Sequence, residues 1–160
     1  MPVAPVIDDT SLVLDTDVLT DWRYGHANTR QAIKDYISRL NRPPALASIN
    51  VFEAVHGFER ILAKPGADIE RVRADLAKTE KFIGLCTVLS LDENAARIAA
   101  YVFARLPKKS QNAHWCDVLI AATALSHGFG VATRNWKDFD LIAAHLPATN
   151  QVLRVALWKP

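Results

Sequence analysis

Three acidic residues occupy positions where carboxylates could do chemistry. Asp15 directly follows the apolar run 12–14, Asp117 lies in the largely apolar stretch 114–122, and Glu53 lies in the first turn of a predicted helix. Carboxylates gathered in a partly dry cleft repel each other and resist ionisation unless a cation neutralises them. Their hard oxygen atoms suit Mg²⁺ or Mn²⁺, and such an ion can activate water and stabilise a phosphoryl centre. The three acids therefore predict a metal site for phosphoryl chemistry.

Each of these acids also has a purely structural interpretation. Asp15 or Asp17 could cap the start of a helix, and Asp117 could complement a helix dipole from the first turn. Glu53 follows Asn50 by three residues, which is the spacing of a capping box. For any single acid the structural interpretation is the commoner one. Taken together, the apolar surroundings of Asp15 and Asp117 favour a shared metal site.

The elements that must position these acids alternate between short apolar runs and amphipathic stretches. Strands are expected at 12–14, 45–48, 87–91, 129–133 and 151–155. Helices are expected over 29–40, from near residue 50, and over 68–82, 93–106 and 115–127, with a polar, basic connector at 107–112. This order predicts an α/β sandwich around a mainly parallel five-stranded sheet. In such sheets functional groups collect beyond the carboxyl ends of the strands, which is where the acids lie.

Length and composition limit the other possibilities. A chain of 160 residues that is 50% hydrophobic suits one domain, with residues 1–10 as an N-terminal tail. The net charge of +2 permits nucleic-acid binding without predicting it. Two cysteines without CxxC spacing, no signal peptide and no apolar run of membrane-spanning length indicate a cytoplasmic protein. Five scattered histidines lack zinc-helix spacing, and His114 with Cys116 is interpreted as local structure.

Three segments together resemble the PIN-domain ribonucleases, and in particular the VapC-type toxins of bacterial type II toxin–antitoxin pairs. Residues 12–19 (LVLDTDVL) resemble the family's opening strand and first acid, and residues 48–57 (SINVFEAVHG) resemble its second acid on a helix. Residues 117–139 resemble the region of the third and fourth acids and form the most specific match. The likeness extends over residues 11–158. It implies a PIN-like three-layer sandwich.

The resemblance also assigns roles to individual residues. Asp15 and Asp117 are the expected metal ligands, and Glu53 is the expected third acid, which binds metal or positions water. Asp17 and Thr133 are expected to support the site through hydrogen bonds.

The sequence offers two candidates for the fourth ligand, Asn135 and Asp138. Some family members have an aspartate where this chain has Asn135, and others have an acid three residues later, which here is Asp138. We favour Asp138 as the fourth ligand, with Asn135 in a supporting position.

The implied activity is Mg²⁺-dependent hydrolysis of RNA, with Mn²⁺ as a substitute ion, inhibition by a cognate VapB-like antitoxin, and homodimerisation. Lys108, Lys109 and Arg134 are candidate RNA-phosphate contacts, although an ordinary solvated loop explains them equally well. One alternative is a PIN-like module that binds RNA or protein without cutting. Another is a haloacid-dehalogenase-like phosphatase, because the Asp15-Thr16-Asp17 triplet matches the DxD motif of that family. Leu19 stands where that family has Thr or Val, and no GDxxxD motif follows, so this alternative is disfavoured.

Overall fold

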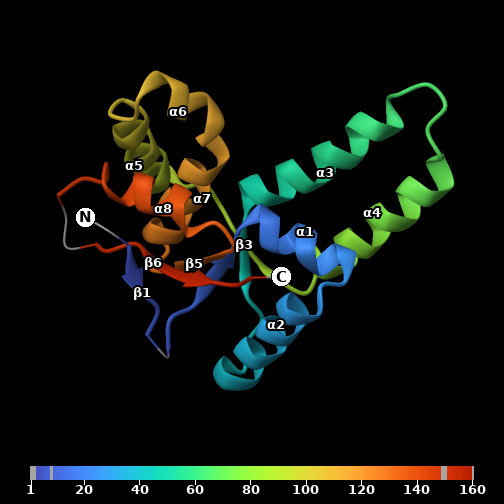
Figure 1. Cartoon of the computed structure of the whole chain (residues 1–160), viewed down its shortest axis with the longest axis horizontal. Helices are drawn as coiled ribbons and strands as arrows, with labels where there is room; N and C mark the ends of the chain where they lie inside the picture. The colour runs from blue at the N-terminus through green and yellow to red at the C-terminus, as the bar shows by residue number, and fades with distance from the viewer. Residues whose placement is uncertain (1–2, 8, 149–150, 160) are drawn as a thin grey trace.

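A computed structural model describes residues 3–7, 9–148 and 151–159 and shows one parallel sheet (Figure 1). The strands are β1 (Ala4–Pro5), β2 (Leu12–Leu14), β3 (Ala45–Ala47), β4 (Thr87–Leu89), β5 (Gly130–Thr133) and β6 (Arg154–Leu157). Their order across the sheet is β1-β6-β5-β2-β3-β4, and every neighbouring pair is parallel. The expected α/β class and parallel sheet are confirmed.

The predicted number of five strands is wrong, because the part of the chain that the structure describes forms a sheet of six. The additional strand, β1, lies in the segment expected to be an N-terminal tail, where Ala4 and Pro5 pair with Arg154 and Val155. Its short length and its proline hide it from sequence analysis, since proline is tolerated only at a sheet edge. The last strand, β6, begins three residues later than the predicted segment 151–155.

Helices connect the strands. They are α1 (Thr16–Tyr24), α2 (Ala27–Leu40), α3 (Ser48–Leu62), α4 (Ile69–Ile83), α5 (Glu93–Phe103), α6 (Lys108–Ala113), α7 (Trp115–Ser126) and α8 (Trp136–Ala143). The connector expected at 107–112 is wrong, because α6 occupies most of it. All of α6 is described and none of its residues is buried, so it has no apolar periodicity for the sequence to reveal. Among the described residues, no helix is long and apolar enough to cross a membrane.

Alternating side chains on the strands divide the core into two halves. Val13 of β2 packs in a cluster with α5, α7 and α8, whereas Leu12 and Leu14 pack in a second cluster with α1, α2 and the end of α4. Val131 and Ala132 of β5 divide in the same way. This two-residue period is that of a strand buried on both faces. The result is the expected three-layer sandwich (Figure 1).

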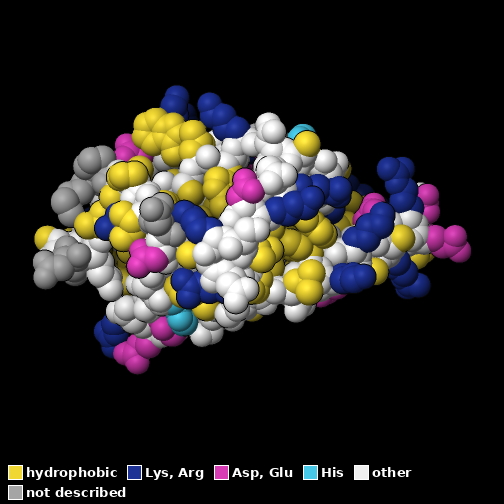
Figure 2. Space-filling model, turned by 90° about the horizontal axis from the view of Figure 1, so that it is seen from below, with side chains coloured by type: hydrophobic (Ala, Val, Ile, Leu, Met, Phe, Trp, Pro, Cys, Tyr) yellow, Lys and Arg dark blue, Asp and Glu magenta, His cyan; other side chains and the backbone are white. Residues whose placement is uncertain are grey.

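The helices α3 and α4 form a hairpin that projects from this body (Figure 1). Seen from below, the far end of the hairpin carries charged side chains of both signs, while hydrophobic side chains show on the surface nearer the body (Figure 2). The tip is therefore a hydrated, mixed-charge surface.

Local interactions mark the start of α5 and the end of α7. Asp92 caps α5, since its Oδ1 accepts from the Ala95 N–H at 2.8 Å. Gly128 follows the end of α7 with φ of 73°, the left-handed conformation that favours glycine. The Ser126 hydroxyl at the end of α7 also donates to Asp92 at 2.7 Å, which ties the two helices together. This contact holds α7, the helix that presents Asp117.

Candidate active site

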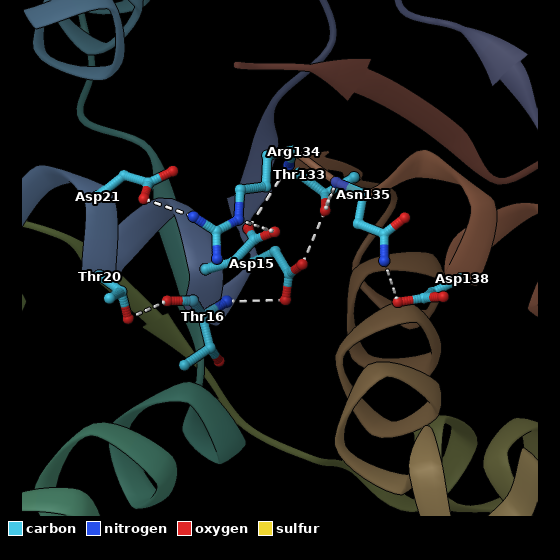
Figure 3. A network of polar contacts seen from close by, with 9 residues as sticks. Asp15, Thr16, Thr20, Asp21, Thr133, Arg134, Asn135 and Asp138 are labelled. Carbon is cyan, nitrogen blue, oxygen red and sulfur yellow. Dashed lines mark hydrogen bonds and ion pairs between the residues drawn. The ribbon is translucent and has the colours of Figure 1, made fainter. Parts of the chain in front are cut away.

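The site lies where the chain direction across the sheet reverses. From β2 the chain proceeds to β3 and β4 on one side, and it returns to place β5 on the other side of β2. Asp15 follows β2, and Thr133 ends the adjacent strand β5. The Thr133 hydroxyl donates to Asp15 Oδ2 at 2.8 Å (Figure 3). This is the crevice in which open parallel sheets bind their ligands.

Asp15 is both a helix cap and a buried acid of the site. Its Oδ1 accepts from the Thr16 N–H at 2.7 Å at the start of α1, so the capping interpretation is confirmed. Its side chain is nevertheless almost enclosed, with the residue only 6% exposed. Asp15 Oδ1 therefore caps α1, and Oδ2 accepts a hydrogen bond from Thr133 within the crevice.

Glu53 is held by a polar chain that the sequence did not reveal. The helix α3 begins at Ser48, so Glu53 lies in its second turn, and both the first-turn placement and the capping-box interpretation are wrong. Instead, Asn50 accepts from the Ala47 N–H at 2.7 Å and donates to the Thr16 hydroxyl at 2.9 Å. That hydroxyl in turn donates to Glu53 Oε2. Thr16 and Asn50 thus fix the second acid relative to the first.

We expect Asn50→Ala to destabilise the protein by about 1–3 kcal/mol, because it leaves the buried Ala47 N–H without its acceptor. Urea unfolding measures this change in the free energy of unfolding. The matched control is Asn112→Ala, at an exposed position on α6. Equal stability of the two variants would contradict the structural role of Asn50.

Asp117, Asp138 and His114 meet on the other side of the crevice. His114 Nδ1 lies 3.1 Å from Asp117 Oδ2 and 3.9 Å from Asp138 Oδ1. The Asn135 amide donates to Asp138 Oδ2 at 2.6 Å (Figure 3). Asn135 therefore holds one carboxylate oxygen of Asp138, and the role of Asp138 as a metal ligand stays a prediction. His114 was missed as a member of the site, although its spacing of three residues before Asp117 on a helix start was a usable signal.

The charges of the acids act on one another. Burial, followed by the charges of Asp17 and Asp117, raises the pKa of Asp15 well above its ordinary value, although hydrogen bonds from Thr133 and Thr16 oppose this. Burial also raises the pKa of Asp117 to about 6, with further contributions from the charges of Asp138 and Glu53 against the lowering effect of His114. Asp117 therefore lies close enough to Asp15, Glu53 and Asp138 for their negative charges to repel its own.

Asp17 belongs to an ion-pair cluster at the edge of the site. Arg134 Nε lies 3.3 Å from Asp17 Oδ2. The Arg134 guanidinium also donates to Asp21 Oδ1 at 2.8 Å (Figure 3). Asp21 is buried, and its other carboxylate oxygen finds no hydrogen-bond partner among the described residues. The cluster ties the end of β5 to α1. Arg134 is thus engaged by two carboxylates, and its contact with RNA stays a prediction.

The Cys116 thiol lies in the wall of the site. Burial raises its pKa, and the thiol's hydrogen bond to Glu53 and the nearby charges of Glu53 and Asp117 raise it further. The thiol is therefore protonated at neutral pH and is a poor nucleophile.

Comparison with known proteins identifies this constellation. Residues 12–144 match the PIN domain family, which covers most of the chain and all of the acids described above. The chain belongs to the PIN domain family. This membership confirms the resemblance inferred from the sequence, and it leaves the phosphatase alternative without support.

Relatives of this PIN domain are toxin–antitoxin proteins. The tRNA(fMet)-specific endonuclease VapC of Salmonella typhimurium is 34% identical over 115 residues, which are 72% of this chain and 81% of that protein. DNA-bound VapBC from Salmonella typhimurium aligns with a TM-score of 0.69 at 26% identity, over 94% of this chain and 99% of that one. VapBC2 from Rickettsia felis, bound to a promoter fragment, also has a TM-score of 0.69, at 17% identity over 92% and 98% of the two chains. At that identity the likeness to VapBC2 shows the fold.

The donor set of this PIN domain fits a divalent cation. Asp15, Asp117 and Asp138 present carboxylate oxygens, the ligands that Mg²⁺ and Mn²⁺ prefer. The raised pKa values of Asp15 and Asp117 show that the surrounding protein leaves their negative charge incompletely neutralised. A cation would supply the missing positive charge.

Proposed function

We propose that this PIN domain is a Mg²⁺-dependent ribonuclease and acts as the toxin of a VapBC-type toxin–antitoxin pair. The observation that carries the proposal is the electrostatic coupling of Asp15 with Asp117, two acids far apart in sequence whose charges meet in one crevice. A binding module without catalysis has no need to maintain such repulsion. The name and activity of the Salmonella typhimurium relative support the same assignment.

The residues of the chain divide the catalytic work. A bound Mg²⁺ would be held by Asp15, Asp117 and Asp138, and it would stabilise the negative charge that develops on the phosphate. Thr133 and the Thr16 N–H keep the Asp15 carboxylate oriented toward the crevice. Glu53, fixed by the Thr16 hydroxyl, orients a water molecule for in-line attack on phosphorus and accepts its proton.

The decisive experiment incubates the purified protein with RNA, with and without EDTA, and then restores Mg²⁺ or Mn²⁺. Because the similar Salmonella protein acts on an initiator tRNA, a tRNA pool is the first substrate. Cleavage that EDTA stops and metal restores would support the proposal. Stable RNA binding without cleavage would favour the silent binding module instead.

The proposed partner is a VapB-like antitoxin, since VapBC complexes are among the similar structures. Stoichiometric addition of the cognate antitoxin should suppress RNA cleavage. We also propose a homodimer, which sedimentation should report as twice the chain mass. We also propose that the protein acts in the cytoplasm, where its RNA substrate would be found.

We propose that Lys108 and Lys109 contact RNA phosphates. Both are exposed on α6, which leads through His114 into the helix of Asp117. We expect the Lys108→Ala/Lys109→Ala double variant to weaken RNA binding and to reduce the salt dependence of binding by about two counterions. Fluorescence anisotropy at several salt concentrations measures both effects.

The matched control for this pair is Lys64→Ala/Lys81→Ala. These lysines are also exposed, but they lie on the projecting α3–α4 hairpin. If both double variants bind RNA as the original protein does, α6 is an ordinary solvated helix.

A further inference from the structure

His114 adds a nitrogen atom to a site otherwise made of oxygen donors. Its Nδ1 and one carboxylate oxygen from each of Asp117 and Asp138 all lie within 4.8 Å of one another. The three side chains are partly shielded, with exposed fractions of 20%, 23% and 30%. They form a compact, partly exposed cluster.

The backbone holds His114 in place from both directions. It lies between α6 and α7, where its N–H donates to the Ser110 carbonyl at 3.0 Å and its own carbonyl accepts from the Val118 N–H at 2.9 Å. Asp138 is held through its other oxygen by Asn135. The geometry is therefore set by two helices and not by a loose loop, which is the arrangement that precise ligand sites require.

We propose that His114, Asp117 and Asp138 form a mixed nitrogen–oxygen side of the metal centre that binds a later first-row transition dication, such as Co²⁺, in preference to Mg²⁺. This inference deepens the proposed function, because it concerns the ion that the same site takes. It assigns to His114 a direct bond to the metal.

The distances agree with this assignment. Metal–nitrogen and metal–oxygen bonds of about 2.0–2.2 Å put two ligands of one ion roughly 3–4 Å apart. The separations of 3.1 Å and 3.9 Å from His114 Nδ1 to the two carboxylates fall in that range. To bind, Nδ1 offers its lone pair and the imidazole carries its proton on Nε2.

The chemistry of the donors explains the preference. Mg²⁺ selects oxygen ligands and water, whereas imidazole nitrogen suits later transition metals. A site made only of carboxylates also binds Co²⁺ more tightly than Mg²⁺. The informative quantity is therefore how far the ratio of the Mg²⁺ Kd to the Co²⁺ Kd falls when His114 is removed. A competing explanation is that the His114 ring only donates a hydrogen bond to Asp117 and orients it.

The test measures metal binding to the full chain without RNA. Isothermal titration calorimetry gives the Kd for Mg²⁺ and for Co²⁺, and pulsed electron paramagnetic resonance of bound Mn²⁺ detects a directly bonded ¹⁴N nucleus. We expect His114→Ala to lower the ratio of the Mg²⁺ Kd to the Co²⁺ Kd by about tenfold or more, and to remove the ¹⁴N signal.

Two further variants distinguish the explanations. His114→Gln retains a side-chain hydrogen-bond donor but offers no imidazole, so we expect it to behave like His114→Ala. His26→Ala, at an exposed histidine at the start of α2, should keep both the ratio and the signal. Thermal melting confirms that each variant is folded.

Absence of a ¹⁴N signal in the original protein would overturn the inference, as would an unchanged Kd ratio in His114→Gln. Neither readout involves RNA. A protein that bound Co²⁺ through His114 but cut no RNA would contradict only the proposed ribonuclease activity. Conversely, Mg²⁺-dependent cleavage without the ¹⁴N signal would contradict only the proposed bond between His114 and the metal.

Discussion

Replacing Asp117 with Asn should lower the rate of RNA cleavage by about 10³-fold or more, since several kcal/mol of metal-derived stabilisation are lost and each 1.36 kcal/mol is a tenfold change in rate. Asp117 is central because its charge acts on Asp15 and its carboxylate contacts His114. The amide is nearly the same size, so the fold should persist. Cleavage of a tRNA pool at saturating Mg²⁺ measures the loss.

The matched control is Asp75→Asn, at a partly exposed aspartate on α4 that pairs only with the neighbouring Lys78 among the contacts described. Its cleavage rate should stay within a few-fold of the original. Circular dichroism and thermal melting should show both variants folded. A folded Asp117→Asn protein with full activity would rule out the metal-centred scheme.

In the absence of metal, the free energy of unfolding should fall as the pH rises from about 4 to about 6. Asp117 has a pKa of about 6 in the folded protein, against an ordinary value of 3.8. Between these values the folded protein binds the proton more tightly than the unfolded chain does, so protonation favours folding and is lost as pH rises. The difference is worth up to about 3 kcal/mol. The raised pKa of Asp15 acts in the same direction.

A divalent cation should reverse this loss, because it binds the ionised carboxylates of the folded protein. At about 100 times its Kd, the ion should add about 2.7 kcal/mol at neutral pH. For a chain of this size that corresponds to a rise in Tm of roughly 5–10 °C. Urea unfolding over pH 4–8, with EDTA or with Mg²⁺, measures both effects.

Asp117→Asn again serves as the comparison. In this variant the free energy of unfolding of the metal-free protein should depend less on pH and should be higher at pH 7. Mg²⁺ should stabilise the variant much less than it stabilises the original protein. Metal-free stability that rises steadily from pH 4 to pH 7 would contradict the electrostatic picture of the site.

Much of the fold is encoded in local patterns. The apolar runs that became β2, β3 and β5 are buried on both faces, and short stretches with such composition have few other stable arrangements than a covered parallel strand. Asp92 and Gly128 mark helix ends through interactions within a few residues. Elements without an apolar pattern, such as α6, escaped prediction.

The sequence alone determined which acids could form the site, because Asp15, Glu53 and Asp117 each follow a recognisable local element and together resemble the PIN pattern. Only the tertiary structure decided how they are held. The Thr16 hydroxyl donates a hydrogen bond to Glu53, which is 37 residues away in the sequence, and Thr133 donates one to Asp15, which is 118 residues away. Such partners are chosen by strand order and helix packing, which no local propensity encodes. The placement of His114 against Asp138 depends in the same way on how α7 packs against α8.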